Sequence, residues 1–390
     1  MDQVPSRFVD APAIRARFGD RVDRLASFLT RSDPLADAAT SELLSLPYAE
    51  RDRRLTELAV SGPKAASSPA LLALAESVHQ APVWFDRARA ELGGAAFLRT
   101  GLPGGLVLAF RALILGYCSP AGNKPLAYSG RLERDVPRRL VETSRFVHDV
   151  CRQDGLRAGQ PGFVAALKVR MMHAQVRHLL LASGRWKEEW GAPVNQYDMA
   201  GTIQLFSSVV LGGLDRIGIA FSPEEREAFL HLWRYVGWLM GVEEELLATS
   251  AREADDLWTM ISRTQAPPDA DSKALAKALL ESRPAGDPAA GRRSQRMRNF
   301  AYELSRYLVG DEAADLLDYP RSAWVVAPPV VSLFIGQADA LRRVLPFGDR
   351  LTFELGVRYW EGVVRLEAGS AVDFALPRAL RGRDRGRAVA

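Results

Sequence analysis

The sequence predicts an all-α protein built as a single large helical domain. Apolar residues recur at helical spacing along almost the whole chain, and the long alternating runs that are typical of strands are scarce. Boundary residues agree with this periodicity. Ser222-Pro223-Glu224-Glu225 has the N-cap, the early proline and the first-turn acids of a helix start, and Ser183-Gly184 is typical of a helix end. A composition that is 47% hydrophobic and 25% charged suffices for a large buried core.

The periodicity predicts helices in a definite order along the chain. They cover residues 22–29, 70–78, 105–115, 137–151, 163–182, 198–211, 223–247, 298–308 and, last, 349–366. The stretch 102–118 is the most apolar part of the chain, but it contains Arg111 and a Pro103-Gly104-Gly105 break. It is also shorter than the ~20 residues that a membrane span needs. We therefore expect a buried helix whose arginine faces a pocket or a partner, and no transmembrane segment.

Two regions interrupt the helical pattern. Residues 264–293 mingle four prolines with Asp, Ala and Gly around a short helical piece at 272–280. This composition indicates either a mobile surface loop or a lid over a pocket. The run Trp324-Val325-Val326-Ala327-Pro328-Pro329 favours an extended segment before the last helix.

Charge and cysteine usage narrow the class of protein. The net charge of +4, from 51 basic and 47 acidic residues, is too near balance to favour a nucleic-acid partner. Cys118 and Cys151 lack metal or redox spacing and are expected to be reduced. The first residues do not read as an export signal, so we expect a cytoplasmic protein. The basic excess gathers in a tail that we expect to be solvated and disordered, at Arg378, Arg381, Arg383, Arg385 and Arg387.

His173 stands out among the five histidines of the chain. The sequence has no phosphate loop, Gly-x-Gly-x-x-Gly turn, Gly-x-Ser-x-Gly elbow or His-Glu-x-x-His pair. Arg170 and Arg177 lie three residues before and four residues after His173, roughly 40–60° from it around a helix. A neutral imidazole can ligate iron and two guanidiniums can hold carboxylates, so the trio suits a haem with its propionates. The other interpretation is a partly buried histidine in a polar helix.

Three further segments place notable side chains on helices. Arg139, Glu142 and Thr143 are spaced i, i+3 and i+4, which brings a cation, a carboxylate and a hydroxyl together, although simple exposed pairing explains the same spacing. Asp198 is expected to cap the helix of Thr202, whose hydroxyl either meets a propionate or bonds back to its own helix. The aromatic-rich segment 231–241 is either core or the wall of a cofactor pocket.

Taken in order, these segments resemble the rubber-oxygenase catalytic-domain family, which includes the bacterial latex-clearing proteins and the fungal oxygenase of mycophenolic acid biosynthesis. Their shared order and similar spacing carry the resemblance. The matching stretches are Ser32-Asp33-Pro34-Leu35-Ala36-Asp37-Ala38, Arg139-x-x-x-Thr143, the Arg170/His173/Arg177 helix, Asn195-Gln196-x-Asp198 through Thr202, and residues 231–241.

The resemblance implies a helical fold that encloses haem b and uses dioxygen to cleave an isoprenoid C=C bond into carbonyl products. Carried over by position, it implies that His173 is the axial iron ligand and that Arg170 and Thr202, with Arg177 nearby, hold the propionates. It also implies that Arg139 and Thr143 line the distal side.

Glu142 departs from the family pattern. The latex-clearing proteins have a lysine at this position, which can close the sixth coordination site of the iron, and here a carboxylate stands in its place. We hypothesise that Glu142 is a distal hydrogen-bonding group or a base that removes an allylic proton. Structural pairing with Arg139 is the alternative.

The expected organisation has five parts along the chain. They are an N-terminal helical extension (1–30), the helical haem-binding catalytic domain (31–260), the proline- and alanine-rich loop or lid (261–298), a C-terminal helical part packed on the same domain (299–376) and the basic tail (377–390).

We expect a haem b-dependent oxygenase that acts with dioxygen on an apolar small molecule. A polymer substrate is not expected, since no export signal is seen. A haem hydroxylase or peroxidase-like enzyme on the same fold, and a haem-free helical binding protein, are the alternatives.

Overall fold

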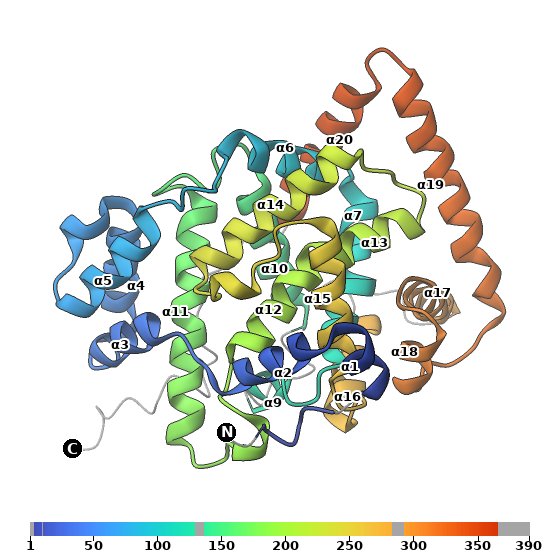
Figure 1. Cartoon of the computed structure of the whole chain (residues 1–390). Coiled ribbons are helices and arrows are strands. Elements are labelled where there is room, and N and C mark those ends of the chain that lie inside the picture. Colours follow the sequence, from blue (N-terminus) through green and yellow to red (C-terminus); the bar gives the residue numbers. More distant parts are fainter. Residues whose placement is uncertain (1–3, 10, 129–135, 283–291, 366–390) are drawn as a thin grey trace, which may run out of the picture.

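The computed structural model describes residues 4–9, 11–128, 136–282 and 292–365 of the chain. Within these ranges the elements are helices, and the only extended pairing is one antiparallel bridge between Phe8 and Gln265. The all-α prediction is confirmed. Figure 1 shows the helices gathered into one body, with α19 running along its edge.

The helices follow one another through short connections. The first ten are α1 (Pro12–Phe18), α2 (Asp20–Ala26), α3 (Pro34–Leu43), α4 (Tyr48–Ser61), α5 (Pro69–His79), α6 (Arg87–Leu98), α7 (Gly101–Val107), α8 (Leu113–Tyr117), α9 (Lys124–Tyr128) and α10 (Val136–Cys151). The next ten are α11 (Pro161–Ala182), α12 (Gln196–Phe206), α13 (Ser208–Arg216), α14 (Pro223–Leu239), α15 (Ala251–Arg263), α16 (Ala270–Leu280), α17 (Arg292–Val309), α18 (Asp311–Leu316), α19 (Ala327–Val344) and α20 (Gly348–Arg365).

One large hydrophobic core joins most of these helices, with members from Phe18 in α1 to Trp360 in α20. Within it α11 packs against α3, α4, α10 and α14, and Figure 1 shows it as a long green column. A smaller cluster holds α8, α16 and α18 together. Burial of apolar surface, at about 25 cal/mol per Å², is what stabilises such an arrangement.

The boundary residues of α14 and α11 confirm two predictions. Ser222 Oγ accepts a hydrogen bond from the Glu225 backbone N–H at 3.1 Å, and the Glu225 carboxylate accepts one from the Ser222 N–H at 2.9 Å. This reciprocal capping box begins α14. At the end of α11, Gly184 adopts a φ of +66°, which favours glycine.

Three expected helices are interrupted in the structure. The helix expected over 198–211 divides at Ser207 into α12 and α13. The helix expected over 223–247 ends at Leu239 because Gly241 turns the chain with a φ of +79°. The apolar stretch 102–118 has a π-helical turn, η3 (Leu108–Ala112), between α7 and α8. Arg111 lies in that turn and donates from Nε to the Val209 carbonyl at 3.0 Å.

The region expected as a loop or lid contains α16, whose Leu275 and Leu279 are buried in the smaller cluster. The short helical piece expected at 272–280 is confirmed as α16, and a mobile loop is wrong for these residues because their apolar face packs on the body. Residues 283–291 and the tail at 377–390 lie outside the described residues.

The extended segment expected at 324–329 is also wrong. A turn of 3₁₀ helix, η6 (Ala323–Val326), leads directly into α19. Pro328 and Pro329 fall in the first turn of α19, where a missing backbone N–H costs nothing.

Length and composition would allow one helical stretch among the described residues, Ala323–Val344, to cross a membrane. A second candidate arises only when α6 and the stretch Gly101–Tyr117 are taken together across their 92° bend. The expectation that the chain has no transmembrane segment stays a prediction.

We predict that Gly93→Ala destabilises the protein by about 3 kcal/mol. A Cβ at Gly93 of α6 would lie 2.4 Å from backbone atoms of Ala228 and Phe229 in α14, so the two helices would have to separate. Gly362→Ala is the matched control, since a Cβ there meets nothing within 4 Å. Urea denaturation should show a stability gain of up to ~1 kcal/mol for Gly362→Ala. Equal stabilities for both variants would contradict the close α6–α14 approach.

Candidate functional site

His173 lies in the middle of α11 as a half-buried side chain. Its Nδ1 is buried and has no hydrogen-bond partner in the described part of the chain. The pKa of His173 is lowered to about 4, mainly by burial and also by the charge of Arg177, while the charge of Asp33 opposes the shift. The ring is therefore neutral at neutral pH, which is the state that ligates a metal.

Arg170, one turn before His173, forms a buried ion pair with Asp33. Its Nε donates to Oδ2 at 2.6 Å and its Nη2 donates to Oδ1 at 2.9 Å. The two side chains are only 5% and 12% exposed. Asp33 also caps α3 by accepting from the Ala36 N–H at 3.2 Å. A bidentate pair buried this deeply fixes the start of α3 against α11.

Arg177, one turn after His173, makes the second tie to α3. Its Nε donates to Asp37 Oδ1 at 2.7 Å, and its Nη1 donates to the Val194 carbonyl at 2.7 Å. The other oxygen of Asp37 accepts from the Ser32 hydroxyl at 2.8 Å. Arg177 thus joins α3, α11 and the loop before α12.

We call the four charged residues Asp33, Asp37, Arg170 and Arg177 the clasp. The clasp guanidiniums already bind protein carboxylates and backbone carbonyls. The expectation that Arg170 and Arg177 hold haem propionates stays a prediction, and it would require these bonds to change partners.

Gly241 and Gln196 close the clasp from the side of α12 and α14. A Cβ at Gly241 would lie 2.2 Å from Asp33 Oδ2 and 2.6 Å from Arg170 Nε, so only glycine fits there. Gln196 Nε2 donates to the Ser32 carbonyl at 3.0 Å and to the Gly241 carbonyl at 2.9 Å. Four of the stretches that carry the family resemblance, scattered from Ser32 to Gly241, therefore meet around α11.

The α10 residues lie apart from the clasp. Arg139 Nη2 donates to the Tyr117 hydroxyl at 3.4 Å, while its buried Nε has no hydrogen-bond partner within the described ranges. Glu142 accepts from Arg138 Nε at 2.8 Å, so the pairing suggested with Arg139 is corrected to Arg138, which lies one full turn away. Thr143 is half-buried on the face of Arg139.

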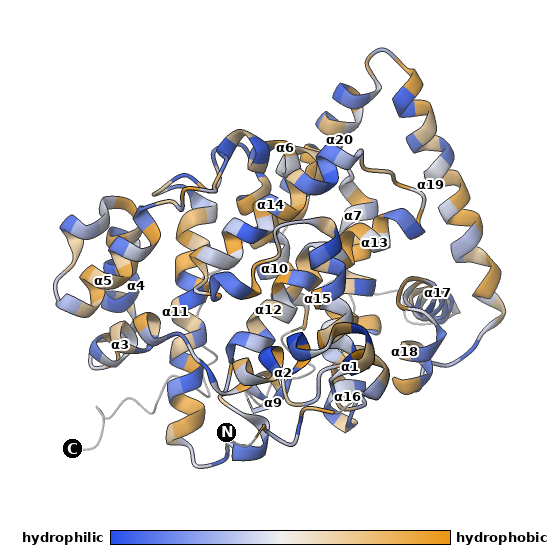
Figure 2. Ribbon diagram, viewed as in Figure 1, coloured by the Kyte–Doolittle hydropathy of each residue, from blue (hydrophilic) through white to orange (hydrophobic). Residues whose placement is uncertain are grey.

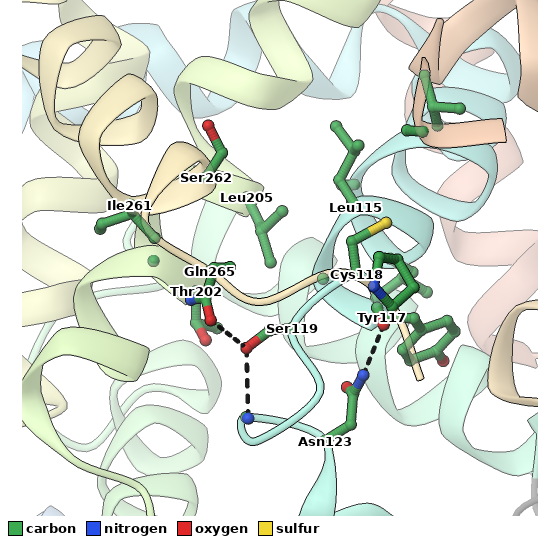
Figure 3. Close-up of a pocket in the computed structure, with 18 of the residues that line it drawn as sticks. Leu115, Tyr117, Cys118, Ser119, Asn123, Thr202, Leu205, Ile261, Ser262 and Gln265 are labelled. Atoms are coloured by element: carbon green, nitrogen blue, oxygen red, sulfur yellow. Dashed lines mark hydrogen bonds between the residues drawn. The ribbon is translucent and has the colours of Figure 1, made fainter. Parts of the chain in front are cut away.

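A pocket of about 570 Å³ lies between α8, α12, α15 and α18, and Tyr117 belongs to its wall. Figure 3 shows Leu115, Leu205 and Ile261 of this largely apolar lining. Thr202 also lines the pocket, and its hydroxyl donates to the Asp198 carbonyl at 2.9 Å, the bond back to its own helix.

The structure thus separates the predicted site residues into groups. Thr202 lines the pocket, and Arg139 reaches it through Tyr117. The described lining of the pocket does not include the remaining five, which are Glu142, Thr143, Arg170, His173 and Arg177.

The expected cap of α12 is wrong, because Asn195 is the N-cap and accepts from the Asp198 N–H at 2.9 Å. Asp198 instead forms a bidentate pair with buried Arg7, at 2.8 and 2.7 Å. Burial lowers the pKa of Arg7, but the charge of Asp198 and its hydrogen bonds to Arg7 outweigh this effect. The pKa of Arg7 is therefore raised above its ordinary value.

The sequence analysis did not identify the partners of Arg170 and Arg177. Asp33 and Asp37 belong to the stretch 32–38 that resembles the family, and their i, i+4 spacing places both carboxylates on one helix face. Nothing local in the sequence pointed to Arg7, which meets Asp198 across 191 positions.

Comparisons with known proteins agree on one family. Residues 99–344 match the family model described as ER-bound oxygenase mpaB/B'/Rubber oxygenase, catalytic domain. The "Rubber oxygenase" of Streptomyces sp. (strain K30) is 25% identical over 314 residues, which covers 78% of this chain and 69% of that protein. The solved structure of Latex Clearing Protein LCP in the closed state has a TM-score of 0.59 at 20% identity, covering 94% of this chain and 96% of that one. That structural likeness supports the fold.

We predict that Asp33→Asn costs about 3–5 kcal/mol of stability, because it leaves the Arg170 guanidinium buried without a carboxylate. Glu57→Gln is the control, since it removes one carboxylate from an exposed pair with Arg53 and should cost less than about 1 kcal/mol. Guanidinium denaturation followed by circular dichroism measures both. If Asp33→Asn lost no more stability than Glu57→Gln, the clasp would not be important for the stability of the fold.

We also predict that the cofactor-free protein loses stability as the pH falls from about 6.5 toward about 4. His173 has a pKa of about 4 in the folded protein and an ordinary pKa of 6.5 in the unfolded chain, so the unfolded chain binds more protons in that window. The loss attributable to this ring is at most about 3 kcal/mol. In His173→Leu this part of the pH dependence should disappear, whereas His178→Leu, at an exposed position of the same helix, should retain it. Urea titrations at several pH values measure the difference.

Proposed function

The chain belongs to the family of ER-bound oxygenase mpaB/B' and rubber oxygenase catalytic domains, and from that premise we propose that it is a haem b-dependent oxygenase that uses dioxygen to cleave a C=C bond of a lipophilic, isoprenoid-like substrate. Membership confirms the family resemblance and makes the chain an oxygenase. The haem, the use of dioxygen and the substrate class are the proposal.

The state of His173 is the observation that carries the proposal. A neutral imidazole can bind a porphyrin iron, and His173 is neutral and makes no hydrogen bond at its buried Nδ1 among the described residues. A half-buried ring in surroundings that strongly disfavour its charged form fits a ligand poised for such a bond. When bound, the haem would supply the iron that performs the oxygen chemistry.

The clasp would hold this ligand in place. Because Arg170 and Arg177 tie α11 to α3 one turn before and one turn after His173, the imidazole sits on a segment that is fixed at both ends. An axial ligand on a rigid helix keeps its direction, which a metal bond requires.

On α10, Arg139 and Glu142 would act on the substrate side. The buried Nε of Arg139 has no hydrogen-bond partner among the described residues, and such a donor can stabilise negative charge that develops on oxygen. Glu142 accepts from Arg138 Nε at 2.8 Å, which orients the carboxylate that would serve as the base.

The pocket beside Tyr117 suits the proposed substrate. Its wall is lined by Leu115, Leu205, Phe206, Trp258 and Ile261, which would exclude water and bury an apolar chain. Tyr117 links this wall to Arg139, so a substrate in the pocket would lie next to the polar face of α10.

We predict that His173→Ala abolishes stable haem retention and leaves the helix content nearly unchanged. The variant removes the proposed axial bond, while neighbouring contacts of α11 remain. Haemin titration with absorbance in the Soret region measures retention, and His178→Ala is the matched control on the same helix. Equal haem occupancy in His173→Ala and the wild type would overturn the axial assignment.

We further predict that Glu142→Gln lowers turnover by at least about 100-fold if this carboxylate is the base. Arg138→Gln removes only its ion-pair partner and should retain most of the activity. The assay follows a polyprenyl substrate under ¹⁸O₂ by mass spectrometry and should give two carbonyl products, each with one labelled oxygen. Full turnover by Glu142→Gln would show that Glu142 is not the base. A product with a single labelled hydroxyl would show that the reaction is hydroxylation and not cleavage.

A further inference from the structure

The hairpin formed by α19 and α20 carries several large apolar side chains that are strongly exposed. Phe334, Val344 and Phe347 are 69%, 75% and 77% exposed. Of the most apolar stretch of α19, only 17% is buried. Figure 2 shows apolar residues recurring along α19, and Figure 1 shows the α19–α20 corner projecting from the body.

The amphipathicity of α19 is inverted. The side that faces the body is mostly polar, since Ser332, Asp339 and Arg342 are buried there beside Pro328 and the half-buried Ile335. At roughly 100° per residue, the exposed apolar positions fall on the opposite side of the helix. They are Val330, Leu333, Phe334, Leu341 and Val344. A helix on the surface of a globular protein normally presents the reverse pattern.

Polar bonds fix this orientation. Asp339 accepts from Arg342 Nε at 2.9 Å and from the Ala220 N–H at 3.2 Å. Arg342 also pairs with Asp349 at the start of α20. A rotation that buried the apolar face would break the bond from the Ala220 N–H to Asp339 and turn the buried Ser332 and Arg342 away from the body, so these contacts hold the apolar face outward.

The tip of the hairpin is apolar on more than one side. Leu345 and Phe347 are exposed in the turn, and Leu351, Phe353 and Leu355 are exposed at the start of α20. Leu351 and Phe353 lie about 160° apart around the helix, yet both are exposed. A second copy of the chain would cover one side of such a tip, whereas a lipid phase surrounds it.

The charges near the tip suit anionic headgroups. Arg343 and Arg350 are exposed there, at 50% and 82%, and pair with Asp339 and Glu354 at the surface. Basic side chains beside an apolar insertion strengthen binding to anionic lipids. Trp324, also exposed, lies at the opposite end of the apolar face, and tryptophan favours the interface between lipid and water.

We propose that the α19–α20 hairpin docks this protein on a lipid surface, with the apolar face of α19 and the hairpin tip inserted at the level of the headgroups and the first acyl carbons. The helix lies in the interface rather than across the bilayer, because its other face packs against the body, where Asp339 accepts from the Ala220 N–H and Ile335 contacts the main core. This assignment does not depend on the proposed chemistry, although a surface rich in lipids would also be the source of a lipophilic substrate.

Vesicle flotation of the full-length protein tests the proposal. The wild type should float with vesicles of phosphatidylcholine and phosphatidylglycerol, less with phosphatidylcholine alone, and less at high salt. Phe334→Ser/Phe347→Ser should weaken the partition by at least about tenfold. Val83→Ser/Leu181→Ser, at exposed apolar positions outside the hairpin, should float as the wild type does. Circular dichroism checks that both variants are folded.

Several outcomes would overturn the proposal. Absence of flotation for the wild type, or equal flotation of the hairpin variant, removes lipid docking. A dimer in sedimentation velocity that Phe334→Ser/Phe347→Ser dissociates, without flotation, assigns the face to a second copy. Resistance to alkaline carbonate extraction indicates a helix that spans the bilayer. Flotation only in a chain truncated after Arg365 assigns the face to the C-terminal segment.

Discussion

The buried pair of Asp33 and Arg170 is the constraint on which the candidate site depends. Taking two charges out of water offsets most of their attraction, so such a pair adds little net stability, but neither partner can be lost alone. The pair therefore fixes the position of α3 relative to α11. Asp33 begins α3, Arg170 lies on α11, and Gly241 follows α14 in contact with both, so one interaction aligns three helices around His173.

The clasp also sets the chemistry of the imidazole between its guanidiniums. Arg170 is neutralised at short range by Asp33, whereas the charge of Arg177 still lowers the pKa of His173 together with burial. The polar half of the site is thus satisfied by the protein itself. Tyr117 connects Arg139 to a largely apolar pocket, which is where the proposed oxygenase reaction would hold an apolar substrate.

The pairing of buried charges also bears on the exposed apolar surface of the α19–α20 hairpin. Asp339 and Arg342 are buried beneath α19 as an ion pair, since a buried charge is costly unless it is paired. Pairing them inward leaves the apolar residues of α19 outward. A soluble neighbour of matching shape or a lipid phase can compensate for that exposure, and the exposure of both sides of the tip favours the lipid.

Sequence alone determined the helical class, the capping box at Ser222, the end of α11 at Gly184, and the grouping of Arg170, His173 and Arg177, because these depend on neighbours within a few turns. The order of the sequence motifs also indicated the family. Tertiary structure decided the partners: Asp33 and Asp37 for the two arginines, Arg7 for Asp198, and Tyr117 for Arg139. It likewise decided that α16 is packed and that α19 begins at its prolines. Those outcomes depend on which separate segments of the chain meet, and local periodicity does not record contacts between residues on different helices.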